Sequence, residues 1–192
     1  DDAEGVAWSE GPERTKVLWG ERICTRFARP ARLLYRTDTW IQGHQDKYRR
    51  AVVLTAQPGE ARLLDQAEGK WIKHDHIAPL AERAVFGVAR SICHILPMLI
   101  EEPFEHDPVA GLTLISAGIE TIEGRRFEVI RGKERWRPEE VVTLWIDAAT
   151  GLLVRVQTAS PGRDGATYYS DLKITPRINV PLGDAEFEIG AF

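Results

Sequence analysis

Apolar and polar residues alternate along most of the chain, in short runs that glycine- and proline-bearing turns separate. The alternation is clear in "RICTRFA" and "DKYRRAVVLTA", and it returns in "LTLISAGIETIEG" and "ATYYSDLKIT". Successive side chains of a strand point to opposite faces, so this alternation predicts half-buried β-strands. The turn signals "QPGE", "AEGK" and "ASPGRDG" recur between the runs, which predicts a meander of short strands.

One segment, "EEVVTLWIDAATGLLVRVQ" at residues 139–157, predicts a complete β-hairpin. Its strands should lie near 141–146 and 152–157, with Asp147 to Gly151 as the loop. An aspartate can hydrogen-bond its own backbone, and a glycine takes positive φ at no steric cost. Asp147 has two candidate roles, a turn residue or a catalytic carboxylate at a strand end, and this local chemistry favours the turn.

The middle of the chain predicts one helix, from about residue 80 to 96. Pro79 precedes it, and Pro97 should kink or end it because proline lacks a backbone donor. Apolar residues recur at spacings of three and four, namely Val85, Val88, Ile92, Ile95 and Leu99. Further apolar residues widen this stripe, so we expect the helix to be buried or to cover an apolar surface.

The order of elements, strands then a helix then strands, lacks the βαβ alternation of a parallel sheet. We therefore expect an antiparallel sheet and a single domain over residues 1–192. Residues 1–20 show no clean period, and we expect an irregular or helical N-terminal segment there. The chain does not begin with Met. Both a removed leader and a trimmed start are compatible with this beginning.

The composition narrows the classes of function. Hydrophobic residues make up 43% of the 192 positions, charged residues 28%, and the formal net charge is -4, values that are ordinary for a globular protein. The chain lacks the basic footprint of a nucleic-acid binder. It also lacks an apolar run near the ~20 residues that a membrane-spanning helix requires.

The sequence offers little catalytic chemistry. It contains no GxSxG, GxGxxG or GxxxxGK[ST] motif, and no carboxylate pair at a motif spacing, so we expect neither an enzyme nor a cofactor. His74 and His76 share a strand face and could bind zinc, but further ligands are not evident, and we expect no metal site. Cys24 and Cys93 could form a disulfide in an exported protein or remain two buried thiols.

The tryptophans are more informative. Trp40, Trp71 and Trp145 lie in strand-like segments, where such side chains either fill a core or line an apolar cavity. With Val88 and Ile92 of the predicted helix, they are our candidate residues for the wall of a ligand cavity.

The C-terminal half resembles the LolA-like superfamily, carriers and sensors of the bacterial envelope. The resemblance lies in "GIETIEGRRFEVI", "VVTLWIDAATGLLVRVQ" and "YYSDLKITPRINVPLGDAEFEI", and upstream in "WIQGHQDKYRRAVVL" and "LLDQAEGKWIKH". Asp147, Thr150, Gly151 and Leu152 match one piece of the family pattern. Ser170 and Asp171 match a second piece, and Phe187 matches its final strand.

This resemblance implies an α+β fold: a strongly curved antiparallel sheet, an incomplete barrel, covered by helices. Its concave face would hold an acyl chain or another apolar partner segment. The implied function is that of a non-enzymatic, periplasmic or otherwise exported protein that binds a lipid or an acylated protein, with an envelope protein as a further partner. The alternative is a sensor or interaction module on the same scaffold, with a filled core and no ligand.

Overall fold

The computed structural model describes residues 2–10, 15–28, 32–41, 48–57, 60–65, 70–76, 79–80, 111–135, 137–162 and 165–187. Within them lie eleven strands and a short 3₁₀ helix. The elements are β1 (Asp2–Glu10), β2 (Thr15–Ala28), β3 (Arg32–Ile41), β4 (Tyr48–Gln57), β5 (Glu60–Asp65), β6 (Lys70–His74), β7 (Leu112–Ile122), β8 (Arg125–Glu134), β9 (Arg137–Asp147), β10 (Leu153–Pro161), β11 (Thr167–Thr175) and η2 (Asp184–Phe187).

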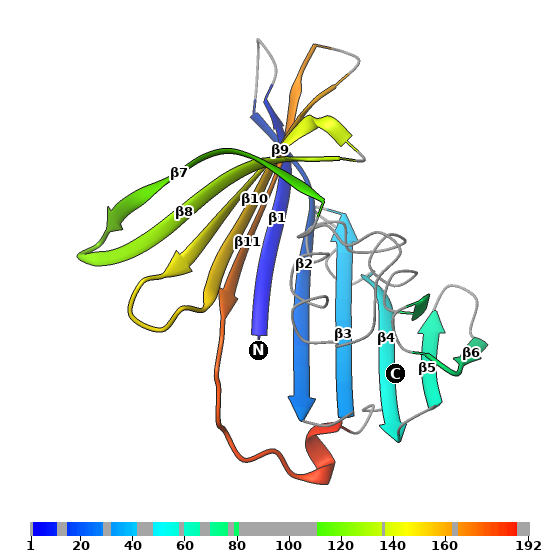
Figure 1. Cartoon of the computed structure of the whole chain (residues 1–192). Coiled ribbons are helices and arrows are strands. Elements are labelled where there is room, and N and C mark those ends of the chain that lie inside the picture. Colours follow the sequence, from blue (N-terminus) through cyan, green and yellow to red (C-terminus); the bar gives the residue numbers. More distant parts are fainter. Residues whose placement is uncertain are drawn as a thin grey trace.

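All eleven strands belong to one sheet, in the order β6-β5-β4-β3-β2-β1-β11-β10-β9-β8-β7. Each neighbouring pair is antiparallel. Figure 1 shows this sheet as continuous and strongly twisted, with β6 and β7 at its two ends. The sheet is therefore open and not closed into a barrel, and the predicted antiparallel meander is confirmed.

The N-terminal strand corrects our expectation for residues 1–20. Asp2–Glu10 form β1 and Thr15–Ala28 form β2, so this region is neither helical nor irregular where the structure describes it. β1 pairs with β2 on one side and with β11 on the other. Backbone hydrogen bonds along both edges stabilise an extended segment whose own sequence has no clean alternation, so the strand depends on its neighbours.

The predicted hairpin over residues 139–157 is confirmed. Its strands are β9 and β10, and residues 148–152 connect them, so the connection begins one residue after the predicted start at Asp147. The Asp147 amide donates to the Leu152 carbonyl at 2.9 Å, and the Gly151 amide donates to the Asp147 carbonyl at 2.8 Å. Gly151 has a φ of 69°, the left-handed conformation that glycine adopts without a steric penalty.

Most of the predicted helix, residues 81–96, lies outside the described residues. Pro79 and Leu80 are helical, and Leu80 is buried in the main apolar cluster of the sheet. A helical cover over the sheet therefore stays a prediction. In the part of the chain that the structure describes, no helix is long and apolar enough to cross a membrane.

The C-terminal segment differs from the strand that the family resemblance implies. Asp184–Phe187 form the 3₁₀ helix η2, and Phe187 is buried against Leu34 of β3. Arg32 binds Asp184 at 2.8 Å, and its guanidinium also lies 4.1 Å from the centre of the Phe187 ring. These contacts hold η2 as one turn of 3₁₀ helix against a face of the sheet. An additional strand would instead have to pair with a free edge of the sheet.

Candidate functional site

The strand register gives the sheet two chemically different faces. Paired residues of an antiparallel ladder share a face, and the side alternates along each strand. Following the pairs across the sheet places Trp40, Trp71 and Trp145 together on one face, which we call the tryptophan face. The opposite face, which we call the core face, carries the main apolar cluster.

The core face is apolar over nearly the whole width of the sheet. One cluster of buried residues spans strands β2, β3, β5, β9, β10 and β11 and includes Leu80; its members are Ile23, Leu33, Tyr35, Ala61, Leu63, Leu80, Val142, Leu144, Val156, Leu172 and Ile174. Partly buried Phe27, Ile72 and Ile130 pack against the cluster. Glu21 and Thr25 are buried on the same face of β2. The core face thus combines a broad apolar surface with a few polar groups, as binding sites for apolar ligands do.

The tryptophan face holds Trp145 in a polar network. Trp145 is 6% exposed, and its indole N–H donates to Glu120 of β7 at 3.1 Å. The Arg155 guanidinium lies 4.6 Å from the centre of the Trp145 ring and donates to both Asp171 oxygens, at 2.7 and 2.6 Å. A bidentate, stacked arginine is a geometrically specific contact, so this network fixes the order of β7, β9, β10 and β11.

The other two tryptophans of our candidate set have different surroundings. Trp40 lies over Gly20: a Cβ atom added at Gly20 would lie 2.7 Å from the Trp40 ring. Trp71 is 45% exposed on β6, near the end of the sheet. The three tryptophans share a face but are distributed over β3, β6 and β9, and Val88 and Ile92 lie outside the described residues. The role of all five as cavity-wall residues stays a prediction, and for the three tryptophans it requires a ligand on the tryptophan face and not on the core face.

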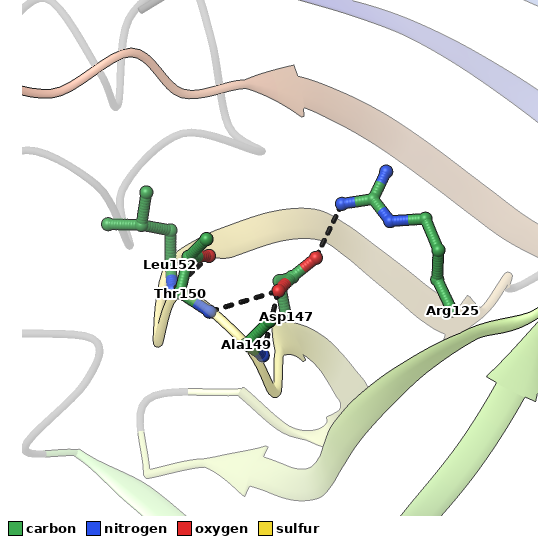
Figure 2. A network of polar contacts seen from close by, with 5 residues as sticks. All are labelled: Arg125, Asp147, Ala149, Thr150 and Leu152. Carbon is green, nitrogen blue, oxygen red and sulfur yellow. Dashed lines mark hydrogen bonds and ion pairs between the residues drawn. The ribbon is translucent and has the colours of Figure 1, made fainter.

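The Asp147 carboxylate accepts hydrogen bonds from the turn and from Arg125, and Figure 2 shows these partners. One oxygen accepts from the Ala149 and Thr150 amides at 2.9 and 3.1 Å. The other oxygen is paired with the Arg125 guanidinium. The Asp147 residue is 4% exposed, whereas the side chain of its partner Arg125 is 66% exposed.

The Arg125 hydrogen bond and the two turn amides hold the pKa of Asp147 below its ordinary value, against an opposing effect of burial. A general base that works near neutral pH needs a raised carboxyl pKa and an accessible oxygen. Asp147 has neither, because its two oxygens are engaged by the turn and by Arg125. Its position supports the turn role that the sequence favoured.

The histidine pair lies at the end of β6. The rings of His74 and His76 are 6.1 Å apart, and the His76 amide donates to Nδ1 of His74 at 3.0 Å. This hydrogen bond occupies Nδ1, one of the two ring nitrogens through which His74 could bind a metal. In the residues that the structure describes, no three His, Cys, Asp or Glu side chains gather where they could hold a metal ion. Cys24 is half-buried on β2, and Cys93 lies outside the described residues.

Sequence reasoning missed two arginine contacts of the C-terminal half. The Arg125–Asp147 pair joins residues 22 positions apart, and the Arg155–Asp171 pair joins residues 16 positions apart. The hairpin pattern predicted the strands but left their relative register open. Once β9 is placed beside β8 and β10 beside β11, the charges in these strands do predict both pairs.

No family model matches this sequence, and no curated protein matches it. Solved structures are similar over almost the whole chain. A LolA superfamily protein from Nitrosomonas europaea has 10% identity and a TM-score of 0.32, covering 98% of this chain and 89% of its own. A DUF1329 family protein from Desulfovibrio piger has 12% identity and a TM-score of 0.35, covering 97% and 89%.

The MucA/MucB complex of Pseudomonas aeruginosa contains a further similar chain, with 14% identity and a TM-score of 0.38. The match covers 100% of this protein but only 58% of that chain. LolA superfamily proteins are thus among the similar solved structures, in agreement with the resemblance found in the sequence. At TM-scores below 0.5, the similarity carries no argument about what this protein binds.

Proposed function

We propose that this protein is a non-enzymatic envelope protein that binds a lipid, the acyl chain of a lipoprotein, or another apolar ligand. The ligand lies against the core face of the sheet. The observation that carries the proposal is the single apolar cluster that spans the sheet from β5 to β9. All described strands belong to one sheet, so none of them forms a separate second layer over this cluster.

The energetics of such a site are favourable for an acyl chain. Each CH₂ group buried from water contributes about 0.8 kcal/mol, so about ten groups would contribute about 8 kcal/mol. This is the scale of a micromolar dissociation constant before the costs of ordering the ligand are subtracted. Glu21 and Thr25, buried on the same face, are suited to orient the polar end of the ligand.

The non-enzymatic part of the proposal is supported by the carboxylates of the C-terminal half. Asp147 is held by a turn and Arg125, and Asp171 by a bidentate arginine. The structural contacts of both carboxylates account for their positions without a catalytic role. The exported location and the acylated or envelope partner rest on the LolA-like sequence pattern alone. They are part of the proposal on that basis.

A matched pair of variants on β6 tests which face binds. Ile72 packs against the main cluster, while its neighbour Trp71 points to the tryptophan face. The delipidated protein is titrated with a fluorescent fatty acid, whose own emission reports binding. We expect saturable binding that Ile72→Lys weakens by about tenfold or more, as loss of two buried CH₂ contacts would, and that Trp71→Lys leaves unchanged.

The control for folding is the circular dichroism melting curve of each variant, with Ile72→Ala as the milder substitution if Ile72→Lys unfolds. Binding that depends on Trp71 and not on Ile72 would move the site to the tryptophan face. The absence of saturable binding would overturn the proposal. It would favour a sensor or interaction module with a filled core.

A further inference from the structure

The strand β7 forms one end of the sheet and exposes large aliphatic side chains. Leu114, Ile115, Ile119 and Ile122 are among the most exposed large apolar residues of the described chain, with Leu114 at 64% and Ile119 at 61%. Its one partner among the described strands is β8. The outer edge of β7 therefore presents backbone donors and acceptors beside exposed apolar side chains.

Edge strands of soluble proteins are normally protected by charged side chains, by proline or by a bulge. β7 contains neither proline nor lysine, and its one charged residue is Glu120. The Glu120 carboxylate accepts from Trp145 and lies 3.7 Å from Arg131, so it is directed over the sheet toward β8 and β9. The bulge between Leu114 and Ser116 leaves a regular stretch of edge from Ser116 to Ile122.

We propose that this protein forms a homodimer in which β7 pairs antiparallel with β7 of a second copy. A second strand is the protein partner that can pair with the whole row of backbone groups at a sheet edge. A two-fold axis at Ile119 places Ile119 against its own copy, Ala117 against Thr121 and Ser116 against Ile122. The paired positions are separated by even numbers of residues, so the same face of each sheet continues across the dimer.

The charges of the β7–β8 hairpin suit a second copy of the chain. From Leu112 to Glu134 the basic and acidic residues balance: Arg125, Arg126, Arg131 and Lys133 against Glu120, Glu123, Glu128 and Glu134. A copy therefore brings no net charge against the same hairpin. Across this axis the two Glu120 side chains lie diagonally on one face, and each has its own Arg131 to offset the repulsion.

Sedimentation velocity of the purified protein tests the proposal, since the monomer mass is 21.6 kDa. We expect a reversible dimer that Ile119→Lys dissociates, raising the dimer dissociation constant by about tenfold or more through lost apolar contact and added like charge. The matched control is Ile178→Lys, because Ile178 is also 61% exposed but lies outside the sheet. It should leave the dimer unchanged.

Both positions are exposed, so unchanged melting curves should accompany both substitutions. Ile122→Lys repeats the test at the end of the paired stretch, opposite Ser116 of the second copy, if Ile119→Lys does not fold. A wild-type protein that stays monomeric at all accessible concentrations overturns the proposal and favours a strand from another protein as the occupant of the edge. A dimer that survives both β7 substitutions, or that Ile178→Lys also dissociates, overturns it as well.

Discussion

Asp147 illustrates how one side chain can serve both a turn and a tertiary contact. Its carboxylate accepts from the turn amides of Ala149 and Thr150 and pairs with Arg125 of the neighbouring strand. The charged form is stabilised by these contacts, which lowers the pKa of Asp147 in the folded protein. A group with a lowered folded pKa adds stability above its unfolded pKa, and this stability is lost as the pH falls.

We therefore expect Asp147→Asn to lower the melting temperature at pH 7 because the amide cannot pair with Arg125 as a charge. The deficit should shrink as the pH falls from 3.8, the ordinary pKa of an aspartate carboxyl, toward the lower folded pKa of Asp147. Melting curves over a pH series check this. Asp184→Asn is the control, since the Asp184 side chain is highly exposed in its pair with Arg32. An equal effect of both substitutions would contradict the account.

Glu140 on β9 should behave in the opposite way. Burial is the main cause that raises the pKa of Glu140, and the Glu134 charge adds to it. A carboxyl with a raised folded pKa costs stability as the pH rises from its unfolded value of 4.5 through the folded value. Glu140→Gln should therefore raise the melting temperature at pH 7, and the gain should disappear below that window. A loss of stability at pH 7 would show that the Arg137 and Ser160 contacts outweigh the burial.

At the level of the element, the β9–β10 hairpin depends on Gly151. This glycine has a φ of 69°, and a Cβ atom added to it would meet no other atom within 4 Å. Gly151→Ala should reduce the free energy of unfolding by about 1 kcal/mol, the cost of the left-handed conformation for a residue with Cβ. Chemical denaturation measures the change.

Gly118 provides the matched control for this substitution. Its added Cβ also meets nothing within 4 Å, but its backbone φ does not lie in the left-handed region. Gly118→Ala should therefore leave the stability unchanged or raise it slightly, because alanine restricts the unfolded chain. Equal losses at Gly118 and Gly151 would point to a cause other than the turn conformation.

A feature of this fold could be predicted from the sequence where the interactions that form it are local. "DAATG" holds its turn chemistry within five residues, so the hairpin could be predicted. β1 has no strong pattern of its own and is extended because β2 and β11 flank it. Phe187 fits the expected final strand by sequence, yet its ring packs on Leu34 within a 3₁₀ turn. Tertiary contacts decided both cases, and local patterns do not encode them.

The candidate site shows the same limit. The alternation predicted which residues share a face within one strand, but register between strands decides how the faces join. For this reason Trp40, Trp71 and Trp145 could be named from the sequence, while their placement opposite the main cluster could not. The register also brings Arg155 between Trp145 and Asp171, a contact that no single strand reveals.

For the whole molecule, β1 joins the two halves of the sheet. The β2–β6 meander and the β7–β11 meander meet only through this strand in the described sheet order. Removing residues 1–10 should expose the edges of both β2 and β11, and we expect the truncated protein to lose cooperative thermal unfolding. Calorimetry of the two chains tests this. A truncated chain that melts like the full one would show that the sheet does not need β1.

The central claim is that the core face holds an apolar ligand. Native mass spectrometry of the protein purified without detergent or organic solvent tests it most directly. We predict a bound species whose added mass, after release and fragmentation, is that of a lipid or of an acylated segment. The same measurement on the Ile72→Lys variant should show less of it, because that substitution places a charge at the border of the apolar cluster. Wild-type protein that carries no such ligand, and that takes none up from a lipid extract, would contradict the account.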